Sequence, residues 1–334
     1  MRVLIGMSGW QESQQLATCW GIRHTQAYNI VHELLCRGVE VVYCQVASPY
    51  LSLEESEQYY GNLDVPPADH ALIIEPIAFH HRTFNWHWSE CYSGHAYPRK
   101  RVGRCPFFEA VRLQVPGCIS TIGDSHCNGL GMEDVMFYEV ERNPADAVQI
   151  PQHSVKLGWA ADGNVFQPNQ DRRPLRILLD HPHYIEGQPD ETDMLVRSLM
   201  EVSAKVCRFG PTAEEDIDPA NYTPTKRYGS RMPHLKVAAI HGKAHVFCVT
   251  HQESQGLSVL EAAMSGSLIV AKKGHIKPAL LDGLAHVTYE EQPDWDATLA
   301  QVNPARARRL ALPYDRWDEV GQIIYDTFDG WSKP

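Results

Sequence analysis

The order of apolar and polar positions predicts two successive α/β series along the chain. In the first, a strand at 3–5 precedes a helix over 25–37, whose apolar residues recur at helical spacing, and a second strand at 39–44. Gly38 stands where the residue after a helix C-terminus is expected. A strand, a helix and a strand within this length predict a parallel pair joined by a crossover. Further strands are predicted at 72–74 and 118–122, and residues 48–70 are polar and rich in turn formers.

The second series begins after a segment rich in Pro, Asp, Gly and Asn over 143–174, which is typical of a connection between domains. It contains predicted strands at 175–180, 206–209, 245–250, 268–271 and 287–289, and predicted helices at 191–204 and 257–264. A last amphipathic helix is predicted within 315–331. A chain of 334 residues is longer than one hydrophobic core usually serves, so two domains are expected.

Composition narrows the class of protein. Hydrophobic residues are 43% and charged residues 21%, which is typical of a globular chain. No stretch approaches the ~20 apolar residues of a membrane span, and the N-terminus runs into a strand without the apolar region of a signal peptide. The nine cysteines include no Cys-x-x-Cys pair, which favours a reduced, cytoplasmic setting. The net charge of −11 disfavours generic binding to nucleic acid or to an anionic membrane.

The most specific pattern is the run over 249–266, VTHQESQGLSVLEAAMSG. Glu253 lies in the loop between a predicted strand and helix, at the strand end where open α/β sheets bind ligands. Backbone N–H groups near the helix start can hold a diphosphate with help from the helix dipole, and Gly256 permits close approach. Glu261 lies farther into the helix, where its carboxylate can accept both hydroxyls of a ribose. The residues predicted to bind this ligand, which the resemblance below implies is a sugar donor, are Ser254, Gln255, Gly256, Leu257 and Glu261. The alternative is an ordinary strand–turn–helix with two solvated glutamates.

This run resembles the Glu-x7-Glu signature of retaining GT-B glycosyltransferases, the superfamily related to glycogen synthase and sucrose synthase. The resemblance implies an α/β fold of two Rossmann-like domains that face each other across a cleft, with a C-terminal helix crossing back to the first domain. It also implies that Glu253 contacts the transferred sugar as a catalytic residue.

Two further segments are similar to parts of the same superfamily. Residues 156–168, KLGWAADGNVFQP, resemble its interdomain element, and residues 20–24 are similar to its N-terminal glycine loop, which adds Gly21 to the donor-binding residues. The helix with Trp317 resembles the C-terminal closing helix. We therefore expect an acceptor domain at 1–155, a nucleotide-sugar-binding domain at 156–312 and the closing helix at 313–334.

The chain also departs from the superfamily pattern. Relatives place an Arg and a Lys after the first strand of the second domain, whereas this loop reads Asp-His-Pro-His-Tyr at 180–184. The cations that can replace them include Arg208 and Lys243, with Lys236, Lys272 and Lys273 left open. Many relatives carry a His where Gly123 stands, and Asp124 and His126 are the candidate catalytic replacements. We expect metal-independent transfer, with a nucleotide-sugar as co-substrate and no other cofactor.

Residues 79–104 interleave basic and aromatic side chains, which suits phosphate pairing with stacking on bases or sugars. A candidate acceptor surface comprises Trp86, Trp88, Arg99, Lys100, Arg101 and Arg104. The same pattern fits an oligosaccharide or small-molecule acceptor, or a loop packed by its own side chains. A zinc site at His87, Cys91, His95 and Cys105 would need helical spacing and lacks a Cys-x-x-Cys pair.

The sequence thus predicts a cytoplasmic glycosyltransferase, a hexosyl- or pentosyltransferase, that moves a sugar from a nucleotide-sugar to a hydroxyl acceptor with retention. Three alternatives stay open: a modified base in DNA as the acceptor, a nucleotide-sugar epimerase of related fold, and a catalytically inactive protein that binds sugar or nucleic acid. A dehydrogenase is disfavoured because no Gly-x-Gly-x-x-Gly follows the first strand.

Overall fold

A computed structural model of the chain describes residues 1–7, 21–44, 53–74, 106–122, 133–138, 153–170, 172–180, 191–209, 213–221, 232, 234–250 and 256–331. The chain forms two compact units. The first comprises Met1–Leu16, Thr25–Trp159 and Trp317–Pro334, and the second comprises Ala17–His24 and Ala160–Arg316.

The first unit is built on a parallel six-stranded sheet in the order β2-β1-β3-β4-β5-β6. The strands are β1 (Arg2–Met7), β2 (Glu40–Cys44), β3 (His70–Ile74), β4 (Ile119–Ile122), β5 (Val135–Tyr138) and β6 (Ser154–Lys156). The helices are α1 (Gly21–Cys36), of which residues 25–36 belong to this unit, α2 (Leu53–Gly61), α4 (Pro106–Gln114) and α11 (Trp317–Asp329). All of β4 and the last four residues of β3 are buried, because parallel strands are covered on both faces.

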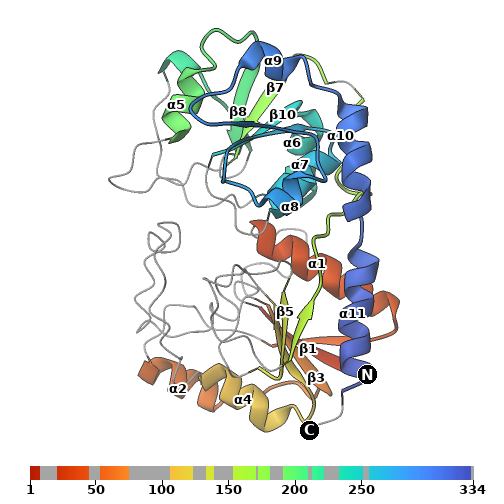
Figure 1. Cartoon of the computed structure of the whole chain (residues 1–334). Coiled ribbons are helices and arrows are strands. Elements are labelled where there is room, and N and C mark those ends of the chain that lie inside the picture. The colour runs from red at the N-terminus through yellow and green to blue at the C-terminus, as the bar shows by residue number, and fades with distance from the viewer. Residues whose placement is uncertain are drawn as a thin grey trace. The chain divides into compact units, whose positions relative to one another are not determined.

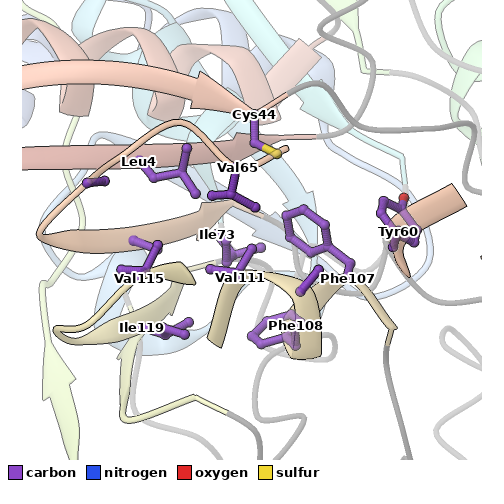
Figure 2. Packing of buried hydrophobic residues seen from close by; sticks show 13 residues of the cluster. Leu4, Cys44, Tyr60, Val65, Ile73, Phe107, Phe108, Val111, Val115 and Ile119 are labelled. Atoms are coloured by element: carbon purple, nitrogen blue, oxygen red, sulfur yellow. The ribbon is translucent and has the colours of Figure 1, made fainter. Parts of the chain in front are cut away.

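Helices α2 and α4 lie side by side against one face of this sheet (Figure 1). Leu4 of β1 and Ile73 of β3 point toward the two helices, and Figure 2 shows them packed with Phe107 of α4. The rings of Tyr60 and Phe107 meet edge to face, with their centroids 5.3 Å apart. This apolar cluster packs α2 against the sheet. The sequence had predicted the segment that contains α2 to be polar and rich in turns.

The C-terminal helix α11 belongs to the first unit, so the chain returns to that unit after completing the second. Phe328 packs on Phe137 of β5 and stacks on His70 of β3. Arg37, just after α1, donates from Nε to Gln322 Oε1 at 3.0 Å and from Nη2 to the carbonyl of Asp318 at 2.5 Å. Apolar packing and these hydrogen bonds therefore hold α11 against the sheet and α1.

The second unit contains another six-stranded sheet, in the order β12-β11-β10-β7-β8-β9, which is parallel except for β9. Its strands are β7 (Arg176–Leu179), β8 (Lys205–Phe209), β9 (Glu214–Asp216), β10 (Val246–Val249), β11 (Leu268–Lys272) and β12 (His286–Tyr289). Its α-helices are α5 (Glu191–Arg197), α6 (His234–Lys243), α7 (Leu257–Met264), α8 (Pro278–Leu281), α9 (Trp295–Leu299) and α10 (Pro304–Ala311), and short 3-10 turns lie at Pro219–Asn221 and Leu312–Tyr314.

The predicted interdomain element forms the entry to the second unit. The Asp162 side chain accepts hydrogen bonds from the backbone N–H groups of Asn164 and Val165, at 2.9 and 3.1 Å. Phe166 is fully buried. The Arg308 guanidinium on α10 donates to the carbonyls of Gly163 and Phe166. These hydrogen bonds hold the turn at 162–166 against α10.

Several elements differ from the sequence prediction. The predicted helix over 191–204 ends at Arg197, where the backbone tightens into turns such as Leu199 N to Val196 O. Sequence periodicity did not predict the strands β5, β6 and β9 or the helices α2, α4, α6, α8, α9 and α10, most of which are short. The two units divide between Trp159 and Ala160 and again between Arg316 and Trp317, a few residues after the predicted boundaries. Within the described residues, no helix is long and apolar enough to cross a membrane.

Candidate functional site

The order of strands in the second sheet reverses beside β7, which defines a topological switch point at the carboxyl ends of β7 and β10. From β7 the chain passes to β8 on one side, and the later strand β10 lies on the other side of β7. Ligands of open α/β sheets bind at the carboxyl ends of strands where the order reverses in this way. Asp180 follows β7 and Thr250 follows β10, and Asp180 N donates to Cys248 O at 2.9 Å. The switch point therefore lies next to the motif over 249–266.

Gly256 starts α7, the helix that follows β10 in the chain. Its φ of 80° and ψ of 19° are left-handed, a conformation that a side chain would strain, and it is the N-cap of α7. The carbonyl of Gly256 accepts from Leu260 N at 2.9 Å, and Leu257 is buried. The first N–H groups of a helix have no acceptor within the helix, and they carry its positive dipole end. This turn thus supplies backbone donors suited to an anion at the switch point.

A buried acid stands beside the first turn of α7. Asp180 is 4% exposed, and its Oδ2 accepts a hydrogen bond from Ser258 Oγ at 3.5 Å. The Thr250 hydroxyl donates to the Asp180 carbonyl, also at 3.5 Å. A carboxylate near a helix N-terminus interacts favourably with the dipole. Sequence reasoning treated position 180 as a missing cation, whereas the structure shows that it links both strands to α7.

Glu261 lies inside α7 and is 4% exposed. Its Oε2 is 4.0 Å from Nε2 of His241, which is on α6 and is 1% exposed. Burial lowers the pKa of His241 to about 3, with His234 adding to the shift, so the ring is neutral near pH 7. The contact is therefore a neutral ring beside a carboxyl group, and no ion pair forms. Sequence reasoning missed His241 because it did not predict α6.

Acid should destabilise the protein through His241. Because the folded-state pKa is depressed, the unfolded chain binds the extra proton between about pH 3 and 6.5, and stability falls as the pH drops below 6.5. One such group contributes about 1.4 kcal/mol per pH unit between pH 6 and 5. His241→Phe should reduce the measured slope by about that amount in urea unfolding at several pH values. An unchanged slope would contradict the lowered pKa of His241. The titratable groups next to His241 are His234 and Glu261.

The two cations predicted to hold the donor diphosphate lie at different places. Arg208 pairs in register with Leu179 near the carboxyl edge, and it forms an ion pair with Glu215 at 3.0 Å. Lys243 ends α6 just before β10, at the amino edge, and its Nζ is 3.8 Å from Glu214 Oε2. Lys243 and Gly256 therefore lie at opposite ends of β10. This separation argues against their binding the same diphosphate.

The sequence contains Asp-x-Asp pairs at 216–218 and 294–296. Asp216 is ion-paired with Lys205 at 2.8 Å, and Asp218 accepts from Ala220 N and Asn221 Nδ2. Asp294 caps α9 by accepting from Ala297 N. Within the residues that the structure describes, no group of three or more His, Cys, Asp or Glu side chains is arranged to hold a metal ion. Metal-independent transfer stays a prediction.

Gly21 is the first residue of α1. The other predicted site residues lie outside the described residues: Glu253, Ser254, Gln255, Asp124, His126, Trp86, Trp88, Arg99, Lys100, Arg101 and Arg104. The zinc interpretation at His87, Cys91, His95 and Cys105 also lies outside them. Of the predicted donor residues, the structure brings together Gly256, Leu257 and Glu261 on one helix beside the switch point.

Solved structures similar to this chain are glycosyltransferases of the GT-B fold. Sucrose-phosphate synthase from Thermosynechococcus elongatus matches with a TM-score of 0.59 and 11% identity, covering 98% of each chain. A glycosyltransferase involved in avilamycin A biosynthesis matches with 0.57 and 13%, covering 98% of this chain and 97% of that one. A glycosyltransferase from Rickettsia africae matches with 0.54 and 10%, covering 98% of each chain.

No protein-family model matches the sequence, and no curated protein matches it either. The fold is nonetheless defined by similarity along nearly the whole chain and by the two parallel-rich sheets. The chain has the GT-B fold, so the predicted fold class is confirmed. The Glu-x7-Glu signature and the roles of its residues stay predictions.

Proposed function

We propose that this protein is a glycosyltransferase that takes a sugar from a nucleotide-sugar and transfers it to a hydroxyl acceptor with retention. The observation that carries the proposal is the turn at Gly256, which starts α7 at the topological switch point of the second sheet. A left-handed glycine at the start of a helix, whose first N–H groups have no acceptor within the helix, suits the diphosphate of such a donor. The glycosyltransferase neighbours support sugar transfer in general.

Within this proposal, residues 254–257 bind the diphosphate and Glu253 contacts the sugar that is transferred. Glu261 accepts hydrogen bonds from the ribose hydroxyls. Side chains on a helix tilt toward its N-terminus, so the Glu261 side chain leans from the middle of α7 toward the Gly256 end. Arg208 is the cation proposed for the phosphates, because it is level with the end of β7.

The proposal is tested with a panel of UDP-, ADP-, GDP- and dTDP-sugars. A matching donor should raise the melting temperature, because binding at about 100 times Kd adds about 2.7 kcal/mol of stability. Slow release of the nucleoside diphosphate from the same donor would then establish turnover and separate an enzyme from a protein that only binds. An epimerase would convert the nucleotide-sugar without releasing the nucleotide. A panel that neither stabilises the protein nor is consumed would refute the proposed function.

Glu261→Ala should weaken binding of the matching nucleotide by about 1–3 kcal/mol, because the ribose hydroxyls lose a charged acceptor. Calorimetric titration of wild type and variant measures the difference. Glu290→Ala is the control, since Glu290 is an exposed glutamate on the same unit that pairs with Lys273. Equal nucleotide affinity in the wild type and Glu261→Ala would remove Glu261 from the donor site.

A further inference from the structure

His241 occupies an enclosed aromatic site between the sheet and α7. The ring centroids of Phe166, Phe209 and Phe247 lie 5.9, 5.2 and 5.3 Å from that of His241. Within the described part of the chain, neither ring nitrogen of His241 has a hydrogen-bond partner. The surroundings are those of a core phenylalanine, yet the residue is a histidine.

A histidine is costly at such a site. The neutral ring always carries one N–H donor, and a buried donor without an acceptor costs roughly 1–3 kcal/mol. A phenylalanine would fill the space among the three aromatic neighbours without that cost. The imidazole N–H therefore needs an explanation other than packing.

The carboxyl group of Glu261 can explain why a histidine stands at this position. This carboxyl group faces the ring, with Oε2 4.0 Å from Nε2 of His241. A movement of about 1 Å would bring these atoms to a normal hydrogen-bond distance of about 3.0 Å. The Glu261 side chain has one more torsion than that of His241, and the His241 ring is confined by the aromatic rings around it.

We propose that His241 is a positioning residue for Glu261. Its Nε2–H donates to one oxygen of the Glu261 carboxylate and leaves the other oxygen for the ligand at the Gly256 end of α7. This role rests on the proposed function for the identity of that ligand, a nucleoside diphosphate group. The neutral ring suits the role, because a protonated His241 would neutralise the carboxylate that has to accept the ribose hydroxyls.

Two variants of His241 separate positioning from packing. His241→Phe keeps an aromatic ring but removes the donor, and His241→Gln keeps an N–H donor but removes the ring. Affinities for UDP, ADP, GDP and dTDP are measured by calorimetry, and melting temperatures are measured beside them. We expect His241→Phe to lose about tenfold in nucleotide affinity, the equivalent of one hydrogen bond to a charged group. His241→Gln should stay within about threefold of wild type although its melting temperature falls further.

Nucleotide affinity that is retained in His241→Phe and lost in His241→Gln would overturn the inference. If His241 only packs, His241→Phe binds nucleotide like wild type, and any loss in His241→Gln follows its melting temperature. A wild type that binds none of the four nucleotides refutes the proposed function.

The contact between His241 and Glu261 can also be tested on the unliganded protein. In this test Glu261→Met is combined with His241→Phe. A contact between the two side chains makes their melting-temperature changes non-additive by about 2–4 °C, and additive changes refute it.

Discussion

Replacing Arg308 by methionine is expected to destabilise the second unit by about 3 kcal/mol. The Arg308 guanidinium donates from Nη1 to the carbonyls of Phe166 and Met264, at 2.7 and 2.6 Å, and from Nη2 to the carbonyl of Gly163 at 2.8 Å. Each hydrogen bond to a charged group contributes about 1.5–3 kcal/mol, and these bonds share one side chain, so they do not add fully. The cation also faces the negative dipole end of α7, which ends at Met264.

Equilibrium urea unfolding measures this effect. Arg309→Met is the matched control, because Arg309 is the next residue on α10 and is exposed, so its replacement should change stability by less than about 0.5 kcal/mol. Arg308→Lys should fall between them, since an ammonium group lacks the planar fork that reaches several carbonyls. Equal stability of the Arg308→Met and Arg309→Met variants would show that the carbonyl network contributes little.

Glu253→Gln is expected to reduce sugar transfer by about 100-fold or more while leaving nucleotide affinity nearly unchanged. The basis is the sequence, in which Glu253 precedes the Gly256 turn by three residues and its carboxylate is proposed to contact the transferred sugar. Removing one preorganised group that stabilises the charge developing in a transition state typically costs about 100- to 1,000-fold in rate. Binding of the base, ribose and diphosphate depends on other residues in the proposal.

The rate is measured as release of nucleoside diphosphate from the donor that the panel identifies, and the affinity by calorimetry. Glu290→Gln is the matched control for the same loss of charge, at an exposed position that pairs only with Lys273 among the ion pairs of the described residues. A Glu253→Gln variant with full activity would contradict the resemblance at this position. A variant that loses nucleotide affinity in parallel would assign Glu253 to the diphosphate instead of the sugar.

The sequence by itself predicted most of the strands that build both sheets, and it missed β5, β6 and β9. The runs 71–74 and 268–271 within β3 and β11 are apolar because parallel strands are covered on both faces, and this pattern is local. It also predicted α7 with the bounds that the structure shows, since Gly256 starts the helix and Gly266 follows its end. Helices α4, α6 and α10 were missed because each spans ten residues or fewer, too few for a clear period.

The arrangement of the predicted cations depended on one of those missed helices. Once α6 is known to end at Lys243 and to be followed by β10, the lysine must lie at the amino edge of the sheet, away from Gly256. From the sequence alone, Arg208 and Lys243 were equivalent choices. The missing information was the direction of one helix relative to the strands.

The tertiary structure alone decided which distant residues meet. Asp180 and Ser258 are 78 positions apart, yet a hydrogen bond joins them. Arg308 reaches Gly163 across 145 positions. The contact of His241 with Glu261 likewise requires two helices to pack together. Hydrophobic periodicity records which side of an element is buried, but it carries no information on which partner covers that side. That partner is determined by strand order and helix packing, and so the residues that hold α7 at the switch point emerge only in the folded chain.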